Sequence, residues 1–320
     1  MPNQLCSGNL PAVASRAAIV YKIYTRSRDA EVIAADPQFR RVASLVPTEV
    51  IALDHLFAHQ SLADNALLTM TACHKAAVDS ANRAGAAVMI LPPDQVYSDG
   101  SFVRCLELAD RGYGAVVLPG IRLSKEGFKS VLASSESSLD AFYGASPRSL
   151  LALAIPHLSP ITRAMFADAV PFSDAPTHVY FRVGDDGFVI RALHLHLLFV
   201  NPRRRVPLRY GNFDTDYLLD ACPSPRDYHV VSDSDEMLAL ELSPAAKQLG
   251  QAGAGPLDKR TLAAFYRQHG NRVHQTFLQT PILMHTGDLT PRWDDAVMRS
   301  GDVIGGALPT WTRLMALIRG

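Results

Sequence analysis

The chain has 320 residues, of which 48% are hydrophobic and 19% are charged, so its composition predicts a globular protein and excludes a disordered one. Lysine plus arginine and aspartate plus glutamate each total 31, a balance that gives no indication of nucleic-acid or anionic-membrane binding. No apolar run approaches the roughly 20 residues that a transmembrane helix needs. Four scattered cysteines without a CxxC pair, and the absence of a signal-peptide pattern, predict a cytoplasmic protein.

Strands and helices alternate through the first half of the sequence. Short apolar runs rich in β-forming residues predict strands at 17–24, 49–53, 86–91 and 115–118. Helical spacing of apolar residues predicts helices at 65–84, 102–111 (with Ser101 as N-cap), 124–132, 147–154 and 160–169. This alternation predicts an α/β fold, with a Rossmann-like and mostly parallel sheet flanked by helices.

The pattern changes near Pro171. Strands are predicted at 178–183 and 188–200, and the Gly-Asp-Asp-Gly between them is typical of a β-hairpin. The remaining predicted elements are a helix or turn at 216–221, a strand at 228–231, a helix at 258–268 and an amphipathic segment at 311–318. Without an internal repeat or a long linker, residues 1–320 are expected to form one compact domain. Its nucleotide-binding α/β half would be 17–170, and its acceptor and metal-site half 171–320.

An acidic loop follows the predicted strand at 86–91 and contains Asp94 and Asp99. Open α/β sheets bind ligands beyond the carboxyl ends of their strands. Carboxylates there would suit a divalent cation that bridges a diphosphate, because hard cations prefer oxygen ligands. Alternatively, these residues only close a turn. Both interpretations stay open.

A second acidic cluster, Ser-Asp-Ser-Asp-Glu at 232–236, follows the predicted strand at 228–231. An extended backbone would place Asp233 and Asp235 on one face, where both could bind one cation. Alternatively, the segment is the exposed start of a helix, with Asp233 or Ser234 as N-cap and Glu236 in the first turn. Another Asp-x-Asp pair, Asp214 and Asp216, also fits either ligands or a helix start.

Histidines provide further candidate ligands. His194 and His196 are two residues apart in a predicted strand, so both imidazoles are expected on one face. Such a pair suits a transition metal or acid–base catalysis, whereas a histidine in this setting is also common as a hydrogen-bonded core residue. His285 lies in the segment HTGDLTPRW near the carboxyl end of the chain.

The N-terminal half resembles the nucleotide-diphospho-sugar transferases, the GT-A type of glycosyltransferase. The resemblance lies in AAIVYKIY, EVIAL, the helix NALLTMTACHKAAVDSANRAGA and AVMILPPDQVYSDGSF. In that fold a helix leads into a strand that ends in an acidic metal-binding motif, often Asp-x-Asp, and here Asp94 and Asp99 stand at that position. HTGDLTPRW is similar to a C-terminal motif of some retaining glycosyltransferases, which implies that His285 is a metal ligand.

The resemblance implies an enzyme that moves a sugar from a nucleotide-sugar to an unknown carbohydrate, lipid or protein acceptor, with Mn²⁺ or Mg²⁺ as cofactor and a homo-oligomer as one possible assembly. The alternatives are a metal-dependent hydrolase that uses His194, His196, Asp233 and His285, and a non-catalytic nucleotide- or carbohydrate-binding protein. The expected nucleotide-binding residues are Thr25, Asp54, Asp94, Asp99 and Arg122. The expected metal ligands are Asp94, Asp233, Asp235, His194 and His285, and the expected catalytic residues are Asp235, Glu236 and His196.

Overall fold

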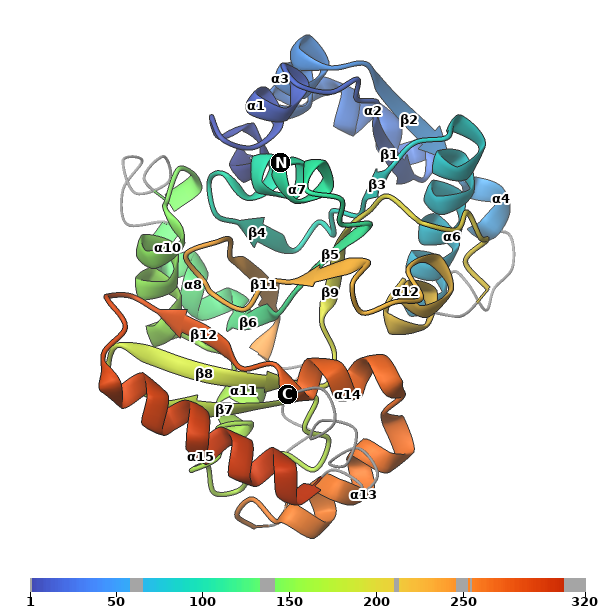
Figure 1. The fold of residues 1–320 in the computed structure, drawn as a ribbon. Helices are drawn as coiled ribbons and strands as arrows, with labels where there is room; N and C mark the ends of the chain where they lie inside the picture. Colours follow the sequence, from blue (N-terminus) through green and yellow to red (C-terminus); the bar gives the residue numbers. More distant parts are fainter. Residues whose placement is uncertain are drawn as a thin grey trace. The chain divides into compact units, whose positions relative to one another are not determined.

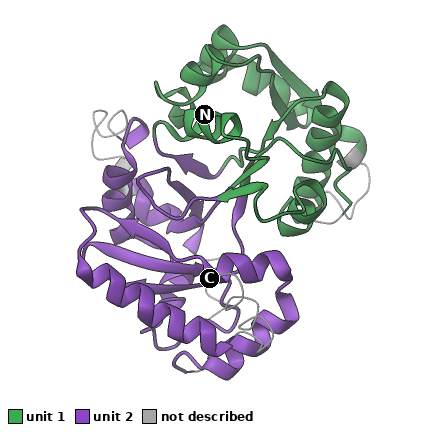
Figure 2. Ribbon diagram, in the orientation of Figure 1, with its two compact units in different colours: residues 1–93, 99–116, 197–229 green, residues 94–98, 117–196, 230–320 purple. Residues whose placement is uncertain are grey.

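The computed structural model describes residues 2–57, 66–132, 142–209, 213–245, 253 and 255–307, so the amphipathic segment predicted at 311–318 lies outside the described residues. The chain forms two compact units, each assembled from three separate segments (Figure 2). Unit 1 comprises Met1–Pro93, Asp99–Val116 and Leu197–His229, and unit 2 comprises Asp94–Ser98, Val117–His196 and Val230–Gly320. The organisation into one domain with two consecutive halves stays a prediction.

Unit 1 is mainly helical. Its helices are η1 (Pro2–Leu5), α1 (Leu10–Ala14), α2 (Ser27–Ala35), α3 (Pro37–Leu45), α4 (Asp54–Phe57), α6 (Ala66–Ala84), α7 (Ser101–Asp110) and α12 (Thr215–Ala221). Asp36 begins α3 by accepting the backbone N–H groups of Gln38 and Phe39, and Pro37 needs no such partner. Strands β1 (Tyr21–Thr25) and β2 (Thr48–Ala52) form a parallel pair, which agrees with the strands expected near 17–24 and 49–53.

A four-stranded sheet has the order β10 (Tyr228–Val230), β5 (Ala115–Leu118), β9 (His196–Val200) and β3 (Val88–Met89). Every residue of β5 is buried, as its continuous apolar run predicts. Strand β3 pairs antiparallel with β9, and the other three sheets are separate from this one. The prediction of one mostly parallel sheet is therefore wrong, although the mixed α/β class is confirmed.

Unit 2 contains two three-stranded sheets (Figure 1). In one, β11 (Ala239–Ser243) lies between β4 (Gln95–Tyr97), its antiparallel partner, and β6 (Gly120–Ser124), its parallel partner. In the other, β8 (Gly187–Ala192) pairs antiparallel with both β7 (His178–Arg182) and β12 (Ile282–His285). The predicted hairpin is thus confirmed as β7–β8, with positive φ angles at Gly184 and Gly187.

Helices complete unit 2. They are α8 (Lys125–Leu132), α10 (Pro147–Ala154), η2 (Ile155–His157), α11 (Pro160–Ala164), α13 (Lys259–His269), α14 (Arg272–Gln279) and α15 (Pro291–Ala307). Helix α15 packs along β8, and α13 packs against α15 (Figure 1). Val189 of β8, Leu262 of α13 and Trp293 of α15 belong to one buried apolar core. Across the described part of both units, no helix combines the length and hydropathy that crossing a membrane requires.

Three local predictions are wrong. The strand expected at 188–200 is two strands in different sheets, and His194 lies in the break between them, so the one-face argument for His194 and His196 fails. Ser101 is the first residue of α7, and Gly100, with φ 86°, is the N-cap. Strand β4 separates Asp94 from Asp99, because its backbone pairs with a strand more than 140 residues further along the chain.

Candidate metal centre

Asp233, Asp235 and His285 come together in unit 2. One ligand atom from each of these residues lies within 4.8 Å of the corresponding atoms of the other two. Asp233 and Asp235 lie in the turn that follows β10, and His285 is the last residue of β12. Three of the five predicted metal ligands therefore meet at one point.

Ser234, the residue between the two aspartates, holds the turn against β12. Its side chain is fully buried, and its backbone N–H donates to the carbonyl of Leu283 at 2.9 Å. The backbone N–H of His285 donates to the Ser234 hydroxyl oxygen at 3.0 Å. The Leu283 N–H in turn donates to the Ser232 carbonyl at 2.8 Å. The middle residue of the Asp-x-Asp motif thus fixes the aspartates beside the histidine.

The backbone at the aspartates is a turn. The N–H groups of Asp235 and Glu236 both point back to Asp233, donating to its Oδ1 at 2.8 Å and to its carbonyl at 3.1 Å. The expectations of an extended segment and of a helix start at 232–236 are therefore both wrong. The turn still brings the two carboxylates to one side, because Asp233 Oδ1 and Asp235 Oδ2 lie 2.8 Å and 3.9 Å from His285 Nε2.

The tautomer of His285 follows from its neighbours. Its Nδ1 lies 2.6 Å from the carbonyl oxygen of Gly287, and a carbonyl can only accept, so Nδ1 carries hydrogen. Neutral His285 then presents the lone pair of Nε2 to the Asp233 carboxylate 2.8 Å away. Two acceptors at this distance need a proton or a cation between them. A backbone carbonyl on Nδ1 with Nε2 aimed at the site is also the arrangement that orients metal-binding histidines.

Burial makes this histidine rigid. Only 2% of the His285 surface is exposed, and its ring meets Trp293 of α15 edge to face, with ring centroids 5.7 Å apart. The carboxylates are more accessible, since the side chains of Asp233 and Asp235 are 42% and 41% exposed. One fixed, buried imidazole and two accessible carboxylates leave room for water or a ligand on the solvent side of a bound cation.

Arg148 is a member of the site that the sequence did not reveal. It is the second residue of α10, whose N-cap Ser146 accepts the backbone N–H of Ser149. Its guanidinium binds Asp235 through Nε at 2.8 Å and Nη2 at 2.7 Å, and binds Asp288 through Nη1 at 2.8 Å. These bonds hold the pKa of the Asp235 carboxyl below its ordinary value.

The charges at this site do not balance. Asp233, Asp235 and Asp288 carry three negative charges and Arg148 carries one positive charge, so these four side chains together carry a net charge of −2. A divalent cation would neutralise that charge. Both the donor set and its charge therefore fit a divalent cation.

The remaining predicted carboxylates have other neighbours. Asp94 has a pKa raised first by burial and then by the nearby charge of Glu241, whose carboxylate is 3.1 Å from the Arg122 Nε. Asp99 accepts the Gly8 backbone N–H at 2.7 Å and the Ser7 hydroxyl at 3.2 Å, which closes its loop. Neither Asp94 nor Asp99 belongs to the group at His285.

In unit 1, Thr25 and Asp54 lie at neighbouring strand ends. Strands β1 and β2 are parallel and in register, with Thr25 opposite Ala52, and the Leu53 N–H donates to the Thr25 carbonyl at 2.8 Å. Asp54 accepts the backbone N–H and the hydroxyl of Ser27, which lowers the pKa of its carboxyl. These contacts bring the two strand ends together. Their role in nucleotide binding stays a prediction.

His194 pairs with a different histidine. Its Nδ1 lies 3.1 Å from Nε2 of His274, whose Nδ1 accepts the Asn271 backbone N–H at 3.0 Å as part of a capping box. Nε2 of His274 therefore carries hydrogen and donates it to His194. Burial and, second, the charge of His194 lower the pKa of His274 to about 3. Within the described parts of the chain, neither His194 nor His196 joins the group at His285.

Glu236, the remaining predicted catalytic residue, follows Asp235 in the same turn and is half-buried.

Comparisons of the chain with protein-family models, with curated proteins and with solved structures found no match.

Proposed function

We propose that this protein is a glycosyltransferase that uses a divalent cation, held by Asp233, Asp235 and His285, to bind a nucleotide-sugar. The observation that carries the proposal is the convergence of an Asp-x-Asp turn with a buried histidine whose Nδ1 is occupied by a carbonyl. Two carboxylates and one imidazole, open on one side, form a site that a cation can share with phosphate oxygens.

The ligand set favours Mn²⁺ over Mg²⁺. Carboxylates suit both ions, whereas an imidazole ligand suits ions of the transition series. When bound, the cation would supply charge stabilisation for a leaving diphosphate. Arg148, which contacts Asp235, would contribute a second positive charge to the same diphosphate.

The residues of the chain would divide the remaining tasks. Asp233 and Asp235 would hold the cation, and the Gly287 carbonyl would keep His285 in the ligating tautomer. Asp235, Glu236 and His196 remain the proposed candidates for the base that activates the acceptor hydroxyl. Thr25, Asp54, Asp94, Asp99 and Arg122 remain the proposed nucleotide-binding residues.

The first test is a thermal-shift experiment with UDP, GDP, CDP and TDP, each with Mn²⁺ and with EDTA. We expect one nucleotide to raise the melting temperature only with Mn²⁺, and Asp233→Asn and Asp235→Asn to abolish the shift. Asp216→Asn is the matched control, because it changes an aspartate of the other Asp-x-Asp pair. No shift with any of the four nucleotides contradicts the proposal.

Donor turnover separates the remaining possibilities. A glycosyltransferase releases the nucleoside diphosphate from the matching nucleotide-sugar. This release is slow when the sugar is transferred to water and faster when the acceptor is present. Mn²⁺-dependent nucleotide binding without any turnover would instead favour a non-catalytic binding protein. Stoichiometric zinc in unchelated protein, lost on changing His194 and His196, would favour the hydrolase, whose four ligands this structure does not bring together.

A further inference from the structure

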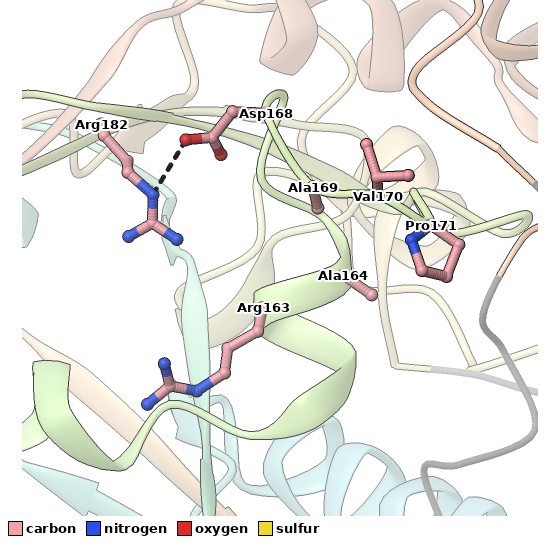
Figure 3. Close-up of a pocket in the computed structure, with 7 residues that line it drawn as sticks. All are labelled: Arg163, Ala164, Asp168, Ala169, Val170, Pro171 and Arg182. Atoms are coloured by element: carbon pink, nitrogen blue, oxygen red, sulfur yellow. Dashed lines mark hydrogen bonds and ion pairs between the residues drawn. The ribbon is translucent and has the colours of Figure 1, made fainter.

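A shallow pocket of about 380 Å³ opens in unit 2 between α11, the turn that follows it and the end of β7 (Figure 3). None of the residues that line it belongs to the Asp233–Asp235–His285 group. Its charged lining residues are Arg163, Arg182 and Asp168, and its uncharged lining residues are Ala164, Ala169, Val170 and Pro171.

The framework of the pocket is held by backbone bonds. The Tyr180 N–H donates to the Met165 carbonyl at 3.0 Å, and the Ala167 N–H donates to the Tyr180 carbonyl at 2.9 Å. The turn after α11 is therefore joined to β7, the strand that ends in Arg182. The two arginines are consequently carried on parts of the chain that are fixed to each other.

Each guanidinium is also positioned by its own partners. Arg163 donates through Nε to the Leu158 carbonyl at 2.9 Å and through Nη2 to the Pro156 carbonyl at 2.8 Å. Arg182 lies over the buried ring of Phe166, with Cζ 3.8 Å from the ring centroid. Because these contacts restrict both side chains before any ligand arrives, less entropy is lost when a ligand binds.

Donor groups remain on both arginines. Arg182 uses Nε for Asp168, at 3.1 Å, and among the described residues its two terminal nitrogens have no hydrogen-bond partner. Nη1 of Arg163 likewise has no hydrogen-bond partner among the residues that the structure describes. Figure 3 shows both guanidinium groups on the same side of the pocket, with Val170 and Pro171 on the other. Two arginines and one aspartate leave a net charge of +1 on the lining.

We infer that this pocket binds a phosphate monoester whose organic part is small. The unused N–H groups of two guanidiniums outnumber the two oxygens of a carboxylate, whereas a phosphate monoester offers three terminal oxygens and a charge near −2. The organic part would contact Ala169, Pro171 and Val170, a residue that is 75% exposed. The site is separate from the proposed cation centre and does not depend on it.

The experiment is calorimetric titration of the whole protein in EDTA with phenyl phosphate and with inorganic phosphate. We expect saturable binding of phenyl phosphate, weaker binding of inorganic phosphate, and loss of about tenfold or more in affinity in Arg182→Gln and in Arg163→Gln. Arg299→Gln, an exposed arginine of α15, is the matched control, and we expect it to change affinity by less than about twofold.

Asp168→Asn is a second variant, which separates a loss of ligand binding from a failure to fold because it is expected to increase the affinity. It removes the carboxylate that competes for Arg182, so we expect it to tighten phenyl phosphate binding about threefold. Asp233→Asn should leave this binding unchanged, which separates the pocket from the cation centre.

Three outcomes would overturn the inference. They are no saturable binding of phenyl phosphate, equal weakening by Arg299→Gln, and weaker binding in Asp168→Asn. Binding to vesicles that contain phosphatidic acid, without binding of phenyl phosphate, would also reject a small-molecule ligand.

Discussion

Two Asp-x-Asp pairs in this protein share one local bond and differ in everything around it. In both pairs, Oδ1 of the first aspartate accepts the N–H of the second, at 2.8 Å for Asp233 and at 3.2 Å for Asp214. Asp214 serves as the N-cap of α12. Asp233 instead faces the buried Nε2 of His285. The Asp-x-Asp motif alone provides this local hydrogen bond. The candidate metal centre also requires His285 at the end of the neighbouring strand β12.

The largest expected effect that distinguishes the pairs is on Mn²⁺ affinity. His285→Gln removes the only imidazole of the group, so we expect it to weaken Mn²⁺ binding by about 100-fold or more. Asp214→Asn and Asp216→Asn should leave the affinity unchanged. Isothermal titration, with electron paramagnetic resonance of free Mn²⁺ as a second readout, measures both. Equal loss in both pairs would show that the local motif, and not its tertiary setting, binds the ion.

The buried pair of His194 and His274 provides a comparison for His285, because His274 faces an imidazole whereas His285 faces an aspartate. Its pKa of about 3, against an ordinary value of 6.5, means that the unfolded chain takes up a proton first as the pH falls. Its contribution to stability is complete above about pH 6.5 and decreases as the pH falls toward 3, by about 3 kcal/mol near pH 4.

Chemical denaturation between about pH 8 and pH 4 measures this slope. His274→Gln should reduce the slope, part of which would remain because burial also lowers the pKa of His178 to about 3, and should leave Mn²⁺ affinity unchanged. An unchanged slope in this variant would mean that His274 is not the group that titrates.

Changing Arg148 is expected to have a smaller effect on Mn²⁺ affinity than changing His285, and in the opposite direction. Its guanidinium neutralises part of the negative charge at Asp235, so Arg148→Gln should strengthen Mn²⁺ binding about threefold to tenfold. The same variant should reduce the nucleotide-dependent rise in melting temperature, if Arg148 also contacts the diphosphate. Arg182→Gln, in the pocket beside α11, is the control. Weaker Mn²⁺ binding in Arg148→Gln would contradict this assignment.

The smallest effect concerns the other pair. Asp214→Ala removes the N-cap of α12, and we expect the free energy of unfolding to fall by about 1 kcal/mol without a change in Mn²⁺ affinity. Asp214→Ser, which retains a capping oxygen, should recover most of the loss. A stability unchanged by Asp214→Ala would show that the cap contributes nothing.

Several elements could be predicted because their signals are local. The Gly-rich turn of the β7–β8 hairpin, the apolar run of β5 and the long helix α6 were each expected within a few residues of their observed bounds. Asp233 and Asp235 are candidates from the sequence because they form an acidic motif after a predicted strand, and His285 is a candidate through the resemblance of its segment to a glycosyltransferase motif.

What could not be predicted depends on distant partners. Strand β4 pairs with β11, and β3 pairs with β9, so strand order and direction are set by segments more than 100 residues apart. Arg148 reaches Asp235 across 87 residues, and its own sequence indicates only the start of a helix. The one-face argument for His194 failed for the same reason, since the chain leaves one sheet and enters another there.

The contact between Asp233 and His285 spans 52 residues of sequence. A cation bound to both would act as a cross-link that closes a loop of this length. In the chain-entropy model, a permanent link of that length lowers the entropy of the unfolded chain by the equivalent of about 4 kcal/mol at room temperature. The cation would thus tie β12 to the turn after β10, as a disulfide does in a secreted protein.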